Sequence, residues 1–236
     1  MSDPSVLQSF WRHVDELRSR VIKSLVVFLL ACVACFNYAD QIIPWIVAPA
    51  GHLVFTSPGE GFAAYMTIAI TMGLIVSSPY LLYHIWAFIA CALTQRERRA
   101  IKVFAPLSLV FFLMGVAFAF FVAVPMSYRF LMSFSSPYLV AMITVNNYLG
   151  FLGQMLIAFG VTFELPLILA FLAKIGVATP EFLRQKRPHA IIIILIIAAI
   201  LTPPDVVSQI LLALPLMVLY EVGIIFVKMS YKHKTL

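Results

Sequence analysis

Residues 190–205 read AIIIILIIAAILTPPD, which is twelve apolar residues followed at once by a turn with two prolines. Twelve helical residues rise about 18 Å, less than the ~30 Å hydrocarbon core of a bilayer. Paired prolines cannot continue a helix, so the chain must reverse there. A second apolar run, residues 206–227, follows directly. The stretch therefore predicts a short helical hairpin whose tip lies below the far membrane surface. A re-entrant hairpin is the alternative, and both return the chain to the side from which it came.

The rest of the chain is similarly apolar. Its 236 residues are 63% hydrophobic and 11% charged, whereas soluble domains are about 45–50% apolar and roughly 25% charged. A soluble core of this size could not bury so much apolar surface, so lipid must cover part of it. We therefore expect an all-α integral membrane protein, one domain over residues 1–236, with six transmembrane helices of which the last two are short. The spans are expected at residues 21–38, 65–90, 101–125, 148–175, 190–201 and 206–227.

Basic residues predict the orientation, because short cytoplasmic loops carry an excess of Lys and Arg. Of the sixteen Lys and Arg, fifteen lie before the first span, between the second and third, between the fourth and fifth, or after the sixth. Only Arg129 lies on the other side. We expect both termini in the cytoplasm. The net charge of +6 is spread over these clusters, which favours anionic lipid and acidic partner segments over nucleic acid.

The two loops on the opposite side, residues 39–64 and 126–147, are long and contain apolar side chains such as Trp45 and Phe130. Loops of this kind are expected to pack on one another as an outer cap, and loose linkers are the alternative. Prolines within the apolar runs favour kinked helices around a concave pocket, although each could be a neutral kink. These prolines are Pro79, Pro106, Pro166 and Pro215.

The sequence has no motif typical of an enzyme or a metal site. There is no P-loop, HExxH, GxSxG or Gly-rich dinucleotide turn, and the five histidines are scattered. Cys32 and Cys35 lie in an apolar run and are expected to be small buried hydrophobes instead of a redox or metal pair. We therefore expect no enzyme activity, no metal and no cofactor.

Two of the few acidic residues lie among arginines at the predicted cytoplasmic face. Glu16 is part of DELRSR (15–20), and Glu97 is part of QRERR (95–99). One interpretation is structural, with helix capping and local ion pairs such as Glu16 with Arg20. The functional interpretation is that the arginines keep both carboxylates ionised, ready to bind an arginine-bearing ligand through forked hydrogen bonds.

Glu164 lies midway along the fourth span, in VTFELP (161–166). A carboxylate at this depth costs roughly 2.5–3.5 kcal/mol or more unless it is protonated, paired or hydrated. Pro166 frees a backbone carbonyl near Thr162 and is expected to kink the helix. We therefore predict a functional role for Glu164. Gln154 could add polarity further out, and Glu221 could snorkel to the interface.

Together these segments resemble the TatC family, the core membrane component of the twin-arginine protein translocase. The resemblance covers residues 13–227. Cys91 departs from it, because the family usually has proline there, and we expect altered termination of the second helix. The segments that carry the resemblance are HVDELRSR (13–20), LIVSSP (74–79), YHIWAFIA (83–90), ERR (97–99), AFGVTFELP (158–166), RP (187–188), LTPPD (201–205) and SQ (208–209).

The resemblance implies a receptor for folded proteins whose signal peptides carry paired arginines. It implies TatA-type and TatB-type single-span partners, a homo-oligomer within the complex, the cytoplasmic (inner) membrane, and export driven by the proton-motive force. Glu16 and Glu97 would bind the two arginines, and Glu164 would face a lipid-exposed pocket and meet a partner's polar residue or water. The residues implied to shape the arginine site are Arg18, Phe88, Arg98 and Arg99, and those implied in cap and partner contacts are Pro49, Asp205 and Gln209.

Two other functions stay open at this point. A proton-coupled small-solute secondary transporter would use Glu164 as its coupling carboxylate, but such folds usually contain internal repeats, and none is apparent here. A structural scaffold or insertase would bind apolar helices without a preference for arginine.

Overall fold

The computed structural model describes residues 4–48, 51, 53–91, 93–136, 142–201 and 206–232. Pro49 and Asp205, expected in cap and partner contacts, lie outside the described residues. Glu97 and Arg99 are placed by their backbone alone. Side chains are described throughout these ranges except at residues 4–13, 96, 97, 99, 201, 207, 208, 211 and 230–232.

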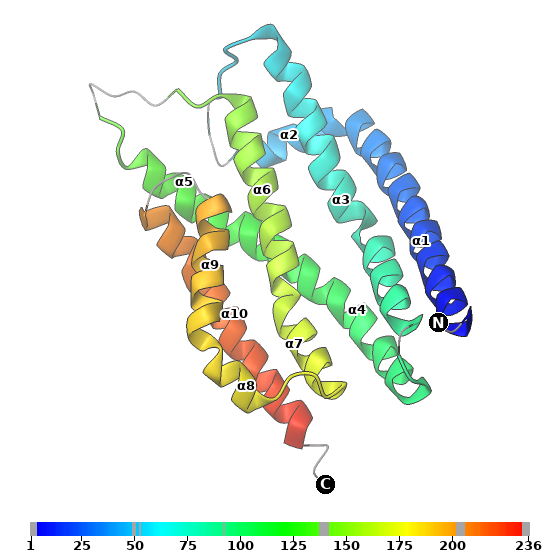
Figure 1. Cartoon of the computed structure of the whole chain (residues 1–236). Coiled ribbons are helices and arrows are strands. Elements are labelled where there is room, and N and C mark those ends of the chain that lie inside the picture. Colours follow the sequence, from blue (N-terminus) through cyan, green and yellow to red (C-terminus); the bar gives the residue numbers. More distant parts are fainter. Residues whose placement is uncertain are drawn as a thin grey trace.

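Helices make up nearly all of the described chain (Figure 1). In chain order they are α1 (Pro4–Asn37), α2 (Ala39–Val47), α3 (Pro58–Cys91), α4 (Gln95–Phe118), the π-helix η2 (Ala119–Ala123), α5 (Val124–Met132), α6 (Val145–Phe163), α7 (Leu165–Lys174), α8 (Pro180–Gln185), α9 (Arg187–Leu201) and α10 (Val206–Lys232). The all-α architecture expected from the sequence is confirmed.

Within the described ranges, five helical stretches are long and apolar enough to cross a membrane, and a sixth apolar helix, Arg187–Ile200, is shorter. The long stretches are Val14–Asn37, Pro58–Cys91, Ala100–Met132, Val145–Lys174 and Leu212–Met229. The expectation that both final helices are short needs correction for α10. Helix α9 has 15 residues, whereas α10 has 27 and continues through Pro215 into a polar last turn.

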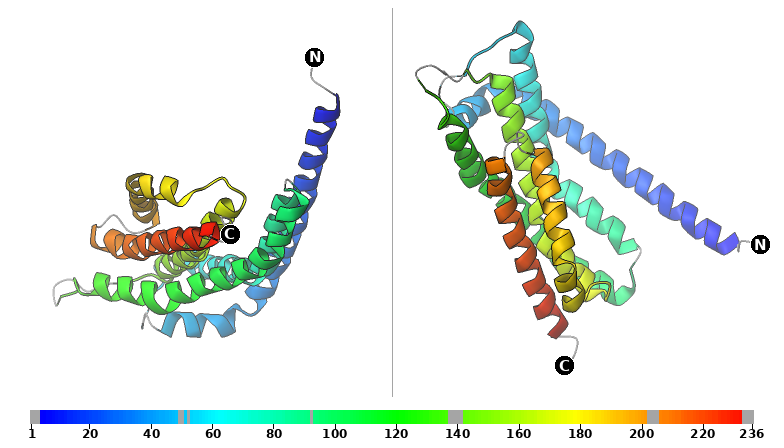
Figure 2. Two further views of the ribbon diagram at one scale, coloured as in Figure 1. Left: turned by 90° about the horizontal axis from the view of Figure 1, so that it is seen from below. Right: turned by 60° about the vertical axis from the view of Figure 1, so that its left-hand side comes forward.

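Some helices pack on helices that are close to them in the sequence, and others pack on helices far along the chain (Figures 1 and 2). Helix α1 packs along α3, α3 packs on α4 and α6, and α10 packs on α7 and α9. Helix α1 lies at the edge, away from α9 and α10. The start of α1, the end of α3 and the last turn of α10 lie at one end of the bundle, here called the inner end. The opposite end, with the segments around Val54 and Thr144, is the outer end.

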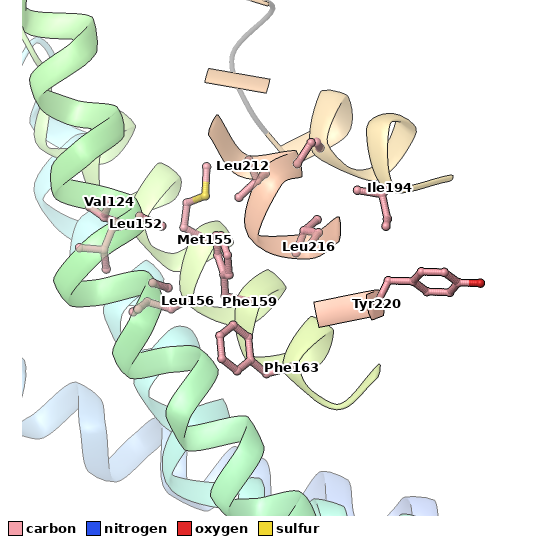
Figure 3. Close-up of a cluster of buried hydrophobic side chains, with 14 of the residues drawn as sticks. Val124, Leu152, Met155, Leu156, Phe159, Phe163, Ile194, Leu212, Leu216 and Tyr220 are labelled. Carbon is pink, nitrogen blue, oxygen red and sulfur yellow. The ribbon is translucent and has the colours of Figure 1, made fainter. Parts of the chain in front are cut away.

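Helix α6 occupies the centre of the bundle. Met155, Leu156 and Phe159 are almost completely buried, and the residues around them include Val124 of α5 and Leu216 of α10 (Figure 3). Burial on several sides explains why residues 145–163 are apolar nearly all round, as expected for an internal helix.

Glycines allow α6 to approach its neighbours closely. A Cβ added at Gly115 of α4 would lie 2.5 Å from the Phe159 carbonyl oxygen, and one added at Gly153 would lie 2.5 Å from Thr71 Oγ1 of α3. Small residues at such crossings are typical of packed membrane helices.

The prolines differ in their effects. Pro166 coincides with a break, because α6 ends at Phe163 and α7 begins at Leu165, so the kink expected there is present. Pro79, Pro106 and Pro215 lie inside helices that continue past them. The π-helix Ala119–Ala123, just before Pro125, was not predicted. Proline has no N–H to donate to the carbonyl one turn earlier, so the regular helical hydrogen bonding is interrupted on its N-terminal side, where the π-helix lies.

The two outer loops contact each other, as expected for an outer cap. Val54 N–H donates to the Ile143 carbonyl (3.1 Å), and Val145 N–H donates to the Val54 carbonyl (3.2 Å). The Tyr148 hydroxyl donates to the Ile46 carbonyl at the end of α2 (3.2 Å). These hydrogen bonds fasten the first outer loop to the start of α6.

Candidate functional site: two carboxylates at different depths

The first candidate site lies at the inner end, between α1 and the last turn of α3. Arg20 donates to Glu16 Oε1 from both Nε (3.1 Å) and Nη2 (2.6 Å). The two side chains are one helical turn apart and partly exposed, 22% for Arg20 and 35% for Glu16. The ion pair predicted from the sequence is therefore confirmed.

Cys91 extends this contact across to α3. Its thiol donates to the same Glu16 oxygen (2.9 Å), and the Ala87 carbonyl lies 3.3 Å away as a second acceptor. His84 Nδ1 lies 3.5 Å from Arg20 Nη1. Sequence reasoning treated Cys91 only as a possible change in helix termination. Its role in joining α3 to Glu16 depends on the register between two helices, which the sequence does not display.

The remaining residues implied in the arginine site are less closely connected. Arg18 is exposed on α1, and Arg98 Nε donates to the Leu93 carbonyl (3.3 Å). The backbone of Glu97 and Arg99 lies at the start of α4, six and eight residues after the end of α3. Phe88 is partly buried and lines a cavity of about 400 Å³ together with Arg20 and His84.

The second candidate site is a concave pocket of about 690 Å³ formed by α3, α4, α6 and α7. Its wall is mainly apolar and includes Phe88, Phe112 and Ile168, while Ser108 and Glu164 supply polar atoms. The concave pocket predicted from the helix prolines is present. Pockets with a few polar groups in an apolar wall are typical binding sites.

Among the described side chains, one hydroxyl group hydrogen-bonds to Glu164. Ser108 Oγ lies 2.8 Å from Oε1 and 2.7 Å from Oε2 of Glu164. Glu164 is 7% exposed and Ser108 is fully buried. Because a hydroxyl has one hydrogen to donate, it can satisfy only part of the carboxyl group. Sequence reasoning found Glu164 from its depth but missed Ser108, since a lone serine in an apolar helix gives no such signal.

An aromatic cluster lies beside the pocket, which is lined by two of its members, Trp86 and Phe171. Trp86, Phe104 and Phe171 have ring centroids 5.0–6.0 Å apart, and they come from α3, α4 and α7. All three are buried. The contacts of Phe171 with Trp86 and Phe104 are edge-to-face, a packing that is stabilising and directional, so it helps to hold the three helices together.

Two amide side chains reach carbonyls of the short helix α9. Gln154 Nε2 of α6 donates to the Ile200 carbonyl (3.3 Å), and Gln209 Nε2 of α10 donates to the Leu195 carbonyl (3.0 Å). At the other end of this hairpin, Arg187 Nη2 pairs with Glu221 (2.6 Å). Gln209, implied in partner contacts, thus already makes a contact within the chain.

Fold and site together define a multi-pass helical membrane protein with a carboxylate–guanidinium pair at its inner end and a buried carboxyl group in a concave pocket. Residues 12–215 match the sequence profile of the family described as Sec-independent protein translocase protein (TatC). The chain belongs to the TatC family.

Curated relatives and solved structures agree with this placement. The TatC protein of Desulforapulum autotrophicum is 36% identical over 99% of this chain and 89% of its own length. That of Carboxydothermus hydrogenoformans is 37% identical over 93% of each. A crystal structure of the twin-arginine translocase receptor TatC is similar to this chain with a TM-score of 0.85 and 35% identity, over 92% of this chain and 99% of the crystallised chain.

Family membership decides between the classes of function that the sequence left open. The chain is a multi-pass membrane component of a protein translocase, in a family that is not enzymatic. The small-solute transporter is not favoured.

Proposed function

We propose that this chain is the receptor subunit of a twin-arginine translocase, which binds the paired arginines of signal peptides on folded cargo. It would lie in the cytoplasmic membrane with both termini in the cytoplasm. The common location of the start of α1 and the end of α10 supports this orientation (Figure 1), as does the distribution of Lys and Arg.

The observation that carries the proposal is the contact between Glu16 and Arg20. A carboxylate at the inner end already accepts two hydrogen bonds from a guanidinium group, the chemistry that a leader arginine requires. Glu97, in the first turn of α4, would supply the second carboxylate. Arg18, Arg98 and Arg99 would hold both acids ionised, and Phe88 would contact the residues that follow the arginines.

The pocket around Glu164 would serve the later assembly step. An incompletely satisfied carboxyl group in an apolar wall suits a polar residue of a TatA-type or TatB-type single-span helix, or water. Gln209 at the hairpin, with Asp205 and Pro49, would support those partner contacts and association with further copies of the chain. Export would draw on the proton-motive force.

The proposal is tested by binding of synthetic leader peptides to the purified protein in lipid nanodiscs. We expect a twin-arginine peptide to bind at least about tenfold more tightly than its twin-lysine counterpart, because an ammonium group cannot reproduce the planar fork. The double variant Glu16→Gln/Glu97→Gln should lose this preference. Glu221→Gln, which removes another carboxylate paired with arginine, is the matched control and should keep it.

Equal affinity for both peptides would contradict the receptor assignment and favour a scaffold that binds apolar helices. Proton-coupled solute uptake by vesicles that contain this chain alone would support the alternative function, a small-solute secondary transporter.

A further inference from the structure

We infer that a groove beneath α2 is a binding site for an acyl chain of a membrane phospholipid, from the leaflet at the outer end of the bundle. This outer groove has a volume of about 670 Å³ and shares no lining residue with the pocket at Glu164. The site involves neither Glu16 nor Glu164 and is independent of the proposed function.

Helix α2 covers the outer side of this groove. It runs across the bundle axis near the outer end (Figures 1 and 2), and Ile42 and Ile46, one turn apart, line the groove. The Tyr148 hydroxyl donates to the Ile46 carbonyl, which ties the end of α2 to the start of α6. Leu156, eight residues further along α6, is also in the wall. The groove therefore extends from α2 by about 12 Å toward the middle of the bundle.

The wall inward of α2 is apolar, with side chains from α3, α4, η2 and α6 such as Met72 and Val116. Among the described lining residues, the side-chain N–H and O–H groups all belong to α2 or to the residue before it. They are the Tyr38 hydroxyl, the Gln41 amide and the Trp45 indole N–H. A groove that is polar at its outer mouth and apolar further in matches a phospholipid, whose ester and phosphate groups lie outside its chains.

The groove opens on the lipid-facing surface of the protein. Tyr38, Trp45 and Phe121 line it and are 60%, 81% and 74% exposed. Tryptophan and tyrosine are enriched where a bilayer meets water, so Tyr38 and Trp45 suit the level of the lipid headgroups. The groove is therefore continuous with the interface that a membrane-spanning chain forms with lipid.

Other occupants fit this groove less well. A buried water needs two to four polar partners, which the wall inward of α2 does not supply. A partner helix that spans the bilayer needs about 20 residues, and α2 blocks its path at the outer end. An empty groove would forfeit the dispersion contacts of its lining. A flexible acyl chain can enter beside Trp45 and restore them.

The test uses Trp45 as a reporter of phospholipid with brominated acyl chains, which quench tryptophan fluorescence on contact. In the Trp11→Phe/Trp86→Phe background, Trp45 is the only tryptophan of the chain. Ala117 lines the groove, and Ala117→Phe fills it with a ring. We expect the brominated-lipid fraction needed for half-quenching in mixed micelles to rise at least about fivefold, because only bulk lipid then reaches Trp45.

Ala34→Phe is the matched control. Ala34 is an exposed alanine of α1 that does not line the groove, so the half-quenching fraction should stay within about twofold. A second readout needs no tryptophan background and serves if that background does not fold. Phospholipid that remains bound after detergent exchange should fall in Ala117→Phe and stay unchanged in Ala34→Phe.

Equal half-quenching fractions in Ala117→Phe and Ala34→Phe would overturn the inference. A changed oligomeric state of Ala117→Phe with unchanged quenching would also overturn it, since the groove would then belong to a contact between copies of the chain. Leader-peptide affinity should stay within about twofold in both variants, because the groove is distant from Glu16. Failure of this site and failure of the proposed function are therefore separate results.

Discussion

Glu16 and Glu164 are the same residue type in two different environments. Glu16 lies at the inner end, one third exposed, and pairs with a guanidinium group from its own helix. Glu164 lies at the α6–α7 break, 7% exposed, and contacts the hydroxyl of a fully buried serine on another helix. A charged, partly solvated partner can be exchanged at small cost, whereas a buried polar contact is costly to break without replacement.

Under the proposed function, the two residues would act in separate steps. Exchange at Glu16 suits recognition of an arginine-bearing segment that arrives from water. The pocket at Glu164 suits a polar group that arrives within the membrane, on a helix that also fills the apolar wall. Variants at the Glu164 pocket, at the α4–α6 contact and at the α9–α10 hairpin test how far the environments of the two carboxylates differ.

The largest effect is expected for Glu164→Ala. Because the change removes the only carboxyl group among the residues that line the larger pocket, transport should fall at least about thirtyfold, which corresponds to about 2 kcal/mol. Leader-peptide affinity should stay within about twofold, since Glu16 is untouched. Transport assays in vesicles, with peptide binding as the second readout, check both parts. A parallel loss of leader binding would show that the two carboxylates act as one site.

Close packing around α6 gives the next effect. Gly115→Ala should lower the free energy of unfolding by about 1.5 kcal/mol, because its methyl group would meet the rigid Phe159 carbonyl. Gly150→Ala is the control in α6, where an added Cβ has nothing within 4 Å. It should be neutral or stabilising by up to about 1 kcal/mol. Unfolding in mixed micelles measures both, and equal effects would refute the close α4–α6 contact.

Ser108→Ala should lower the free energy of unfolding by about 1 kcal/mol, since it removes the described hydroxyl partner of Glu164. Ser78 is the matched buried serine, whose hydroxyl donates to the Ile75 carbonyl of its own helix (2.7 Å). Ser78→Ala should therefore lower the free energy of unfolding by less than Ser108→Ala does. In a double-mutant cycle, Ser108→Ala should add little to Glu164→Ala, and full additivity would exclude a coupled pair.

The smallest effect is expected for Arg187→Met. Its ion pair with Glu221 has the same 2.6 Å distance as Arg20 with Glu16, but both side chains are nearly half exposed. Its loss should change the free energy of unfolding by at most about 0.5 kcal/mol and leave leader binding unchanged. A larger change would indicate that the α9–α10 hairpin depends on this pair.

The sequence was sufficient to predict structural features that depend on a single segment of the chain. Glu164 stands out because an acid in an apolar run is expensive at that depth. The pair between Glu16 and Arg20 follows from their i,i+4 spacing. The short α9 follows from twelve apolar residues before paired prolines.

Features that depend on the register between helices could not be read in this way. Ser108 is one hydroxyl within an apolar run, and only packing of α4 against α6 and α7 brings it to Glu164. Cys91 reaches Glu16 across 75 positions. The full length of α10 was underestimated because apolar character marks the lipid-buried part of a helix, and the polar turn beyond it carries no such mark.

The hydrogen bonds between the outer loops have a mechanical consequence. They join the segments around Val54, Ile46 and Tyr148, so they restrain relative motion of the helices at the outer end. Helix α3 has 34 residues and is about 50 Å long, so each degree of tilt about its outer end displaces its other end by about 0.9 Å. Displacement therefore grows along α3 toward Cys91, at the end where its thiol meets Glu16.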